Sequence, residues 1–206
     1  MIPVLLADDE TLIRVALATM LDLEDDIDVV GHVGSGEELV AAWQQRAAAG
    51  DPVAVAVIDL QLPGIDGIEA AARLLRLTPG AGTLIVTSHG RPGYLKRALA
   101  SGIRGFLPKT ASAATLAEVI RTVHRGGRYV DPELAAEAIS AGDTVLTARE
   151  ADVLEYAVDG SSVEDIARRA HLSPGTTRNY LSSAMAKLGV SNRYEAALKA
   201  REKGWI

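Results

Sequence analysis

The sequence contains no cysteine, a single phenylalanine and few aromatic residues of any kind. Without cysteine the chain can form neither disulfide bonds nor thiolate metal sites, which fits a protein of a reducing compartment. It also lacks an apolar run long enough to cross a bilayer, and no basic stretch leads into an apolar one near its start. We therefore expect a cytoplasmic protein without direct membrane association.

Composition and charge indicate two modules. Of the 206 residues, 48% are hydrophobic, which is enough for a sizeable core. Acidic residues outnumber basic ones by 27 to 21, but residues 144–206 hold 9 Lys and Arg against 8 Asp and Glu. An acidic front and a nearly neutral back predict two modules with different partners.

Short apolar runs alternate with helix-period stretches in the front module. The runs show little polar alternation, as strands buried on both faces do. Five repeats of strand and helix predict an α/β fold with a doubly wound, five-stranded parallel sheet. The expected strands are Ile2–Ala7, Val29–Val33, Val53–Leu60, Thr83–Ser88 and Gly105–Pro108. The expected helices are Leu12–Leu23, Glu37–Ala48, Ile68–Leu77, Pro92–Ser101 and Ala113–Arg125.

The pattern changes after residue 127. Asp131 as N-cap and Pro132 at the first helical position predict a helix to Ile139, and the small polar segment Ser140–Asp143 follows it. The back of the chain shows no strand pattern, and Thr147 with Glu150 forms a capping-box sequence. Four helices are expected at Thr147–Val158, Val163–Ala170, Gly175–Leu188 and Asn192–Lys203. We expect a domain at 1–126, a linker at 127–143 and an all-α domain at 144–206.

Polar residues stand at the ends of four expected strands. They are Asp8 with Asp9, Asp59, Thr87 and Lys109. Parallel strands open their carboxyl ends on one edge of the sheet, where such sheets bind ligands. Three carboxylates there would repel one another unless a hard cation lay between them. The sequence thus predicts an Mg²⁺ site, with the lysine and the hydroxyl aimed at a phosphoryl group.

Asp59 is the candidate nucleophile of this edge. A carboxylate can accept a phosphoryl group as an acyl phosphate, a reaction that depends mainly on neutralising charge. Taken singly these residues have ordinary explanations, because acids suit the turn before a helix and Lys109 could be solvated. Their joint placement favours a site. Gly31, Gly34 and Gly36 suggest a dinucleotide loop, but Leu39 stands where the third glycine of that motif belongs. We therefore interpret these glycines as part of a structural turn.

The front module resembles the receiver domain of response regulators over roughly residues 1–125. The likeness rests on the residues above and on the motif Asp59-Leu60-Gln61-Leu62-Pro63-Gly64-Ile65-Asp66-Gly67. It implies phosphorylation of Asp59 by a sensor histidine kinase and metal ligation by the backbone carbonyl of Gln61. It also implies that Thr87 and Phe106 act as a switch pair, although Phe106 alone could equally be core packing. Pro108 precedes the lysine, whereas many members have proline after it.

The helix expected at Gly175–Leu188 has two distinct faces. One carries Thr177, Leu181, Met185 and Leu188, and Ser173 and Pro174 suit its start. The other presents side chains that can reach base edges, as reader helices do. The DNA-contact candidates are Thr176, Arg178, Asn179, Ser182 and Ser183, with Lys187 and Arg193 for phosphates. A solvated face on a helical bundle is the alternative, and the thin basic surplus predicts weak binding by a single copy.

Residues 144–206 resemble the LuxR-type helix-turn-helix. The matching motifs are Leu146-Thr147-x-Arg149-Glu150, Gly160, Ile166-Ala167, Leu172-Ser173-x-Gly175-Thr176, Arg178-Asn179-Tyr180, Lys187-Leu188-Gly189-Val190 and Asn192-Arg193. Thr177 stands where valine is usual, and its hydroxyl is expected to bond a backbone carbonyl four residues earlier. Tyr180 stands where histidine is frequent. A receiver followed by this reader is the order of the NarL/FixJ family.

The resemblance implies a two-component response regulator that is not an enzyme. Phosphorylation of Asp59 would reorganise the receiver, form a homodimer and present two reader helices to double-stranded DNA with a two-fold related operator. RNA polymerase is a further candidate partner. The candidate dimer surfaces are the helices Pro92–Ser101 and Ala113–Arg125. A further candidate is the first helix of the front module together with its last.

Two other classes of function fit the sequence less well. A phosphohydrolase with an aspartyl phosphate commonly has a second acid two residues after the nucleophile, and Gln61 stands there instead. A regulator controlled by a ligand without phosphorylation is expected to have a degraded acidic pocket, whereas this pocket is complete.

Overall fold

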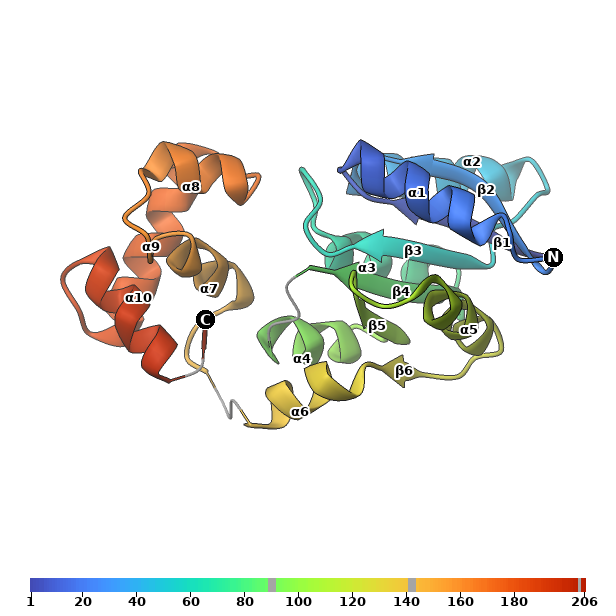
Figure 1. Cartoon of the computed structure of the whole chain (residues 1–206). Coiled ribbons are helices and arrows are strands. Elements are labelled where there is room, and N and C mark those ends of the chain that lie inside the picture. Colours follow the sequence, from blue (N-terminus) through green and yellow to red (C-terminus); the bar gives the residue numbers. More distant parts are fainter. Residues whose placement is uncertain (89–91, 141–143, 204) are drawn as a thin grey trace. The chain divides into compact units, whose positions relative to one another are not determined.

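The computed structural model describes residues 1–88, 92–140, 144–203 and 205–206. The chain divides into two compact units (Figure 1). The first comprises Met1–Gly90 and Arg97–Leu134, and the second comprises Arg91–Lys96 and Ala135–Ile206. Residues 141–143 of the polar segment Ser140–Asp143 lie outside the described residues.

The first unit is built on a six-stranded sheet in the order β2-β1-β3-β4-β5-β6, and every pair is parallel. The strands are β1 Ile2–Ala7, β2 Ile27–Val33, β3 Val55–Asp59, β4 Gly82–Thr87, β5 Gly105–Pro108 and β6 Tyr129–Val130. The predicted doubly wound parallel sheet is confirmed, but the predicted number of five strands is wrong.

The additional strand, β6, runs beside β5. The N–H of Tyr129 donates to the carbonyl of Arg104 over 2.9 Å, and that of Asp131 donates to Phe106 over 3.0 Å. With only two residues, β6 is too short to show any hydrophobic period, so the sequence pattern could not reveal it.

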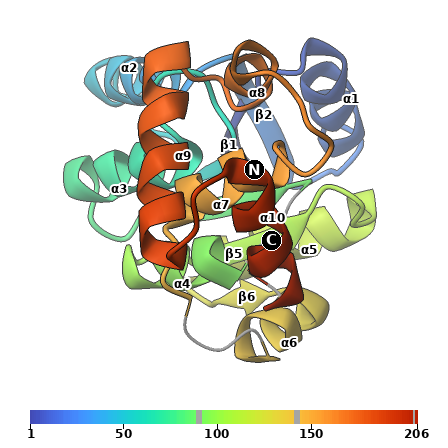
Figure 2. The same ribbon diagram turned by 90° about the vertical axis from the view of Figure 1, so that its left-hand side faces the viewer.

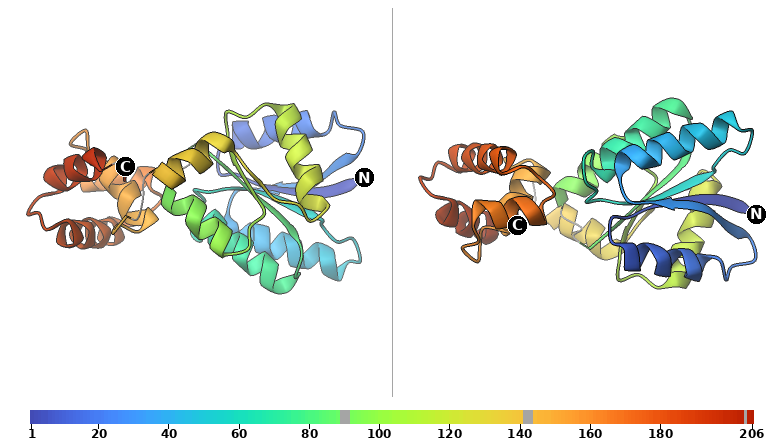
Figure 3. Two further views of the ribbon diagram at one scale, coloured as in Figure 1. Left: turned by 90° about the horizontal axis from the view of Figure 1, so that it is seen from below. Right: turned by 90° about the horizontal axis from the view of Figure 1, so that it is seen from above.

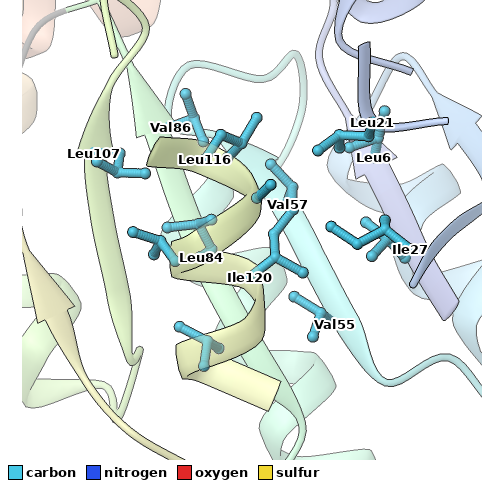
Figure 4. Packing of buried hydrophobic residues seen from close by; sticks show 14 of the residues in the cluster. Leu6, Leu21, Ile27, Val55, Val57, Leu84, Val86, Leu107, Leu116 and Ile120 are labelled. Atoms are coloured by element: carbon cyan, nitrogen blue, oxygen red, sulfur yellow. The ribbon is translucent and has the colours of Figure 1, made fainter. Parts of the chain in front are cut away.

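Helices cover both faces of the sheet (Figure 3). Helices α1, Thr11–Leu21, and α5, Ala113–His124, lie on one face, and α2, Gly36–Ala48, and α3, Gly67–Leu77, lie on the other. Every residue of β3 and β4 is buried, as their unbroken apolar runs predict. Figure 4 shows the core beneath α1 and α5. The side chains labelled there are Leu6, Leu21, Ile27, Val55, Val57, Leu84, Val86, Leu107, Leu116 and Ile120.

Three helices of the first unit begin at a capped residue. The side chains of Ser35, Asp66 and Ser112 each accept the backbone N–H three residues later, at the starts of α2, α3 and α5. At Gly36 an added Cβ atom would lie 2.6 Å from the carbonyl oxygen of Ile65. This close approach of two turns supports the structural reading of the glycines near residue 36. Helix α4, Pro92–Ala100, connects β4 to β5 along the chain.

Helices are the regular elements of the described part of the back of the chain. Helix α6 spans Pro132–Ser140, and the Asp131 carboxylate accepts the N–H of Leu134 over 3.2 Å, as an N-cap does. The others are α7 Ala148–Glu155, α8 Val163–Arg169, α9 Pro174–Leu188 and α10 Arg193–Glu202. Helix α9 contacts each of the other three (Figure 2). Their shared core contains Val153, Leu154, Ile166, Leu181 and Ala196.

No helix among the described residues is both long enough and apolar enough to span a bilayer.

Candidate functional site

Four neighbouring strands of the first unit bring the predicted pocket residues to one edge of the sheet. Asp59 is the last residue of β3 and Thr87 the last of β4, while Asp8 and Asp9 follow β1 and Lys109 follows β5. Their places follow from the parallel pairing of β1 with β3, of β3 with β4 and of β4 with β5. The local sequence supports this, because a buried apolar run ends in each polar residue or just before it.

Lys109 is the cation at the centre of this pocket. Its Nζ atom lies 2.8 Å from Oδ2 of Asp8 and 3.2 Å from Oδ2 of Asp59. The lysine backbone N–H also donates to the carbonyl of Thr87 over 2.8 Å, which fixes the start of the loop after β5. Asp8 and Asp59 are both buried. One ammonium group therefore partly compensates two buried carboxylates.

Three carboxylates of the pocket could together hold a cation. Ligand oxygens of Asp8, Asp9 and Asp59 all lie within 4.8 Å of one another, and only Asp9 is partly exposed. Oxygen atoms at this spacing are the donor set that hard cations such as Mg²⁺ and Ca²⁺ prefer, and Mg²⁺ commonly needs only one or two protein carboxylates. Because one lysine cannot neutralise three acids, the pocket favours a further positive charge.

The pKa of Asp59 also indicates that the pocket favours a further positive charge. Burial raises the pKa of the Asp59 carboxyl to about 7; Lys109 opposes the rise and Asp8 adds to it. Burial alone would lower the pKa of Lys109, but the carboxylates of Asp59 and Asp8 hold it above its ordinary value. The lysine therefore stays charged at neutral pH, and a bound cation would favour the ionised form of Asp59.

The remaining predicted pocket residues occupy the surrounding elements. Thr87 and Phe106 are both almost fully buried, at 1% exposure each. Phe106 pairs with Ile85 in register, and its burial fits core packing as well as an inward-turned switch residue. Gln61 is the second residue beyond β3, in the turn that leads to α3.

One pocket residue was missed from the sequence. Oε1 of Glu10 lies 3.2 Å from Nζ of Lys109, and its backbone N–H donates to Asp8 over 2.9 Å. Glu10 directly follows the acidic pair Asp8-Asp9. Its place as a third consecutive acid is the sequence signal that could have revealed it. Asp8 and Asp59 are buried, whereas the side chain of Glu10 is 57% exposed.

The second unit contains a tight turn between α8 and α9. His171 adopts a left-handed conformation with φ of 53°, and Ser173 then caps α9 by accepting the N–H of Thr176 over 3.1 Å. Pro174 occupies the first turn of α9, as predicted. This turn joins two packed helices in the manner of a helix-turn-helix.

Helix α9 has the two faces that its sequence predicts. Thr177, Leu181 and Leu188 are buried, and the Thr177 hydroxyl donates to the carbonyl of Ser173 over 3.1 Å, the predicted bond to the residue four positions earlier. Ala184 completes the buried face, whereas Met185 is only partly buried.

The predicted DNA contacts differ in their exposure and in their partners. Arg178, Asn179 and Ser182 are exposed, and Thr176 is half-buried beside the cap. Ser183 and Lys187 instead donate to the Glu150 carboxylate of α7, over 2.6 and 2.7 Å. Arg193 is the half-buried first residue of α10. Sequence analysis identified Glu150 as a residue of the capping box and of the LuxR-type motif, but its contacts with α9 were missed.

The comparisons with known proteins agree with both units. Residues 4–121 match the response regulator receiver domain, and residues 144–200 match the LuxR family of bacterial regulatory proteins. This chain belongs to the two-component response regulators. It is a transcription regulator that combines a receiver with a LuxR-type DNA-binding domain.

Two relatives match this response regulator along nearly its whole length. It is 38% identical to the transcriptional regulatory protein DesR of Bacillus subtilis, with both chains fully covered. The stretch Leu23-Glu24-Asp25-Asp26 prompts the same comparison. The crystal structure of ChrA, a response regulator of a heme-sensing two-component system, is 31% identical with a TM-score of 0.56, covering 100% of this chain and 98% of ChrA.

A third relative has been solved with nucleic acid. The structure of the response regulator RcsB in complex with DNA is 25% identical, with a TM-score of 0.60 and 98% of each chain covered.

Proposed function

We propose that this response regulator is switched by phosphorylation of Asp59 in the presence of Mg²⁺. The observation that carries the proposal is the position of the Asp59 carboxylate, buried at a strand end, 3.2 Å from the ammonium group of Lys109 and grouped with two further acids. A sensor histidine kinase is the proposed donor. An oxygen of Asp59 attacks phosphorus, the P–N bond to the histidine breaks, and an acyl phosphate forms.

The pocket residues have separate roles in this transfer. Asp8, Asp9 and Asp59, with the backbone carbonyl of Gln61, would hold Mg²⁺, which supplies positive charge for the transferring group. Lys109 exchanges its contact with Asp59 for one with a phosphoryl oxygen. Thr87, at the end of the neighbouring strand, donates a hydrogen bond to the attached group. Its movement and that of Phe106 transmit the change to the surface of the receiver.

The output of the switch is a dimer that reads DNA. Two receivers associate, and each chain of the dimer presents an α9 whose exposed side chains Arg178, Asn179 and Ser182 face the major groove. A two-fold dimer requires a two-fold related operator. The nearly neutral charge of residues 144–206 supports the need for two copies, because phosphate contacts contribute much of DNA affinity.

The first experiment combines phosphorylation with solution mass. The chain is incubated with Mg²⁺ and acetyl phosphate, and intact mass and light scattering are recorded. Asp59→Asn is the test variant. Asp66→Asn is its matched control, since Asp66 is also buried after β3 but caps α3 and pairs with Arg97, 2.7 Å away. Asparagine can still cap the helix.

We expect one phosphoryl group and a doubled mass in the parent chain and the control, and neither in Asp59→Asn. A phosphoryl group on Asp59→Asn would move the acceptor to another residue. Dimerisation that does not depend on the phosphoryl donor would contradict the switch itself. If acetyl phosphate does not phosphorylate the parent chain, the assay is repeated with a phosphorylated histidine-kinase domain as the donor.

A further inference from the structure

A buried carboxylate in the second unit connects two helices. Glu150 lies in the first turn of α7, and its side chain is only 4% exposed. Its Oε2 atom accepts the backbone N–H of Thr147 over 2.6 Å, which completes the capping box. The same carboxylate also accepts hydrogen bonds from two side chains of α9.

Those two side chains are Ser183 and Lys187. The Ser183 hydroxyl donates to Oε1 over 2.6 Å, and the Lys187 ammonium group donates to Oε2 over 2.7 Å. Both carboxylate oxygens are therefore engaged. Burial alone would raise the pKa of Glu150, but the hydrogen bonds from Lys187, Ser183 and Thr147 hold it below its ordinary value. Glu150 therefore remains a charged partner of Lys187 at neutral pH.

Arg178 and Lys187 are the two basic residues of α9, and both pair with carboxylates of the second unit. They are nine residues apart, which at about 3.6 residues per turn places them on opposite flanks of the exposed face. Arg178 pairs with Glu164 of α8 over 3.0 Å, but these side chains are 59% and 57% exposed. Such an exposed pair separates easily, so Arg178 can turn to DNA.

The pair of Lys187 with Glu150 differs because its acid is buried. Removing Lys187 from Glu150 would leave an uncompensated charge inside the unit, which is strongly unfavourable. An approaching phosphate group must compete with this pairing, whereas it meets little competition at Arg178. The described contacts thus divide the two cations of α9 into one available to DNA and one retained by the protein.

We propose that Glu150 is a specificity-determining residue that withholds Lys187 and Ser183 from DNA. This inference rests on the proposed reading of DNA by α9 and deepens it. With Lys187 retained, sequence-independent attraction to phosphates is smaller, and binding depends more on Arg178, Asn179 and Ser182. Loss of the charge on Glu150 releases Lys187 to the phosphate backbone and raises affinity for DNA of any sequence.

The test uses the full chain and a short duplex of random sequence, with binding followed by fluorescence anisotropy over a series of KCl concentrations. In Glu150→Gln, glutamine retains the capping-box role, because it is accepted at that position. We expect tighter binding and a plot of log affinity against log salt that is steeper by about 0.9, one added phosphate contact. Glu164→Gln is the matched control, and its slope should equal that of the parent, because Arg178 is already available.

Lys187→Met tests the same inference without touching Glu150. We expect an unchanged salt slope in the parent background, and in the double variant Glu150→Gln/Lys187→Met we expect the parental slope to return. A parental slope that falls by about 0.9 on Lys187→Met would overturn the inference, because Lys187 would then already contact phosphate. A folded Glu150→Gln chain whose salt slope equals that of the parent would also overturn the inference.

Failure of the underlying function has a different signature. If Arg178→Met leaves the salt slope of the parent unchanged, or if the parent incubated with Mg²⁺ and acetyl phosphate still shows no binding at the lowest salt, then the assignment of α9 as the DNA reader is wrong. If Arg178→Met lowers the slope and Lys187→Met lowers it equally, DNA reading stands and only the role of Glu150 is rejected.

Discussion

The ammonium group of Lys109 lies closer to Asp8 than to Asp59, at 2.8 Å against 3.2 Å. Asp8 can therefore hold the lysine in place while Asp59 exchanges partners. Such an anchor would keep the cation within reach of the proposed acyl phosphate without a large movement of the loop after β5. The same geometry means that the stability of the receiver depends on how the charge of this pocket is balanced.

Lys109→Met should destabilise the receiver, because it leaves buried carboxylates without their cation. At pH 8 without divalent ions, we expect a loss of about 3–5 kcal/mol in unfolding free energy, as for other broken buried ion pairs. Saturating Mg²⁺ should restore much of it, because an ion that binds the folded state stabilises it by mass action. Urea unfolding can be followed by the fluorescence of the buried Trp43 in a Trp205→Phe background. A loss that Mg²⁺ does not reduce would argue against a cation site at the acidic cluster.

Asp59→Asn should change the pH dependence of receiver stability. Because the folded chain raises the pKa of Asp59 from 3.8 to about 7, it binds more protons than the unfolded chain between these values. The contribution of this group to stability is thus fully present below pH 3.8 and is lost as pH rises through 7. Asparagine mimics the protonated acid, so its stability relative to the parent should increase by about 1–3 kcal/mol from pH 5 to pH 8 without divalent ions.

The measurement for Asp59→Asn is urea unfolding of both chains at several pH values, again by Trp43 fluorescence. The comparison cancels the titration of the other carboxyl groups. Mg²⁺ should shrink the difference between the two chains at pH 8, because the variant has lost the charge that attracts the ion. A difference independent of pH would contradict the raised pKa of Asp59.

Gly67→Ala should disrupt the turn that follows Asp59, the proposed phosphorylation site. An added Cβ atom would lie 2.1 Å from the carbonyl oxygen of Asp59, a backbone atom that cannot move without displacing the end of β3. We expect a loss of about 2 kcal/mol or more, as for other overpacked sites, together with slower phosphorylation. Gly34→Ala is the control in the same unit, since its nearest neighbour, the Arg14 guanidinium, lies 3.6 Å away. Equal behaviour of the two variants would show that the turn can shift freely.

Thr177→Val should leave the second unit folded and similarly stable. The Thr177 hydroxyl is buried, but its acceptor, the carbonyl of Ser173, also receives the backbone N–H of residue 177 over 3.0 Å. Removing the hydroxyl therefore leaves no buried acceptor unsatisfied, and we expect a change within about 1 kcal/mol. Thr177→Ser keeps the hydroxyl but removes a buried methyl group, which should cost about 1 kcal/mol. Thermal unfolding followed by circular dichroism compares them, and a larger loss for valine would give the hydroxyl a structural role.

Much of the fold could be predicted because local patterns determine it. The buried strands show as unbroken apolar runs, and three helix starts show as the capping residues Asp131, Thr147 and Ser173. Strand β6 could not be predicted. Its two residues are paired by the neighbouring β5 backbone rather than by any periodicity of their own.

The amino-acid sequence by itself determined which residues meet at the sheet edge, because parallel strands must end on the same side and each ends in or just before a polar residue. It also determined which face of α9 is buried, through the helical period of its apolar residues. Only the tertiary structure decided how the charges pair. The contact of Glu10 with Lys109, and the division of Arg178 and Lys187 between Glu164 and Glu150, join residues that are distant along the chain. Such contacts depend on how whole helices and strands pack, which no local pattern contains.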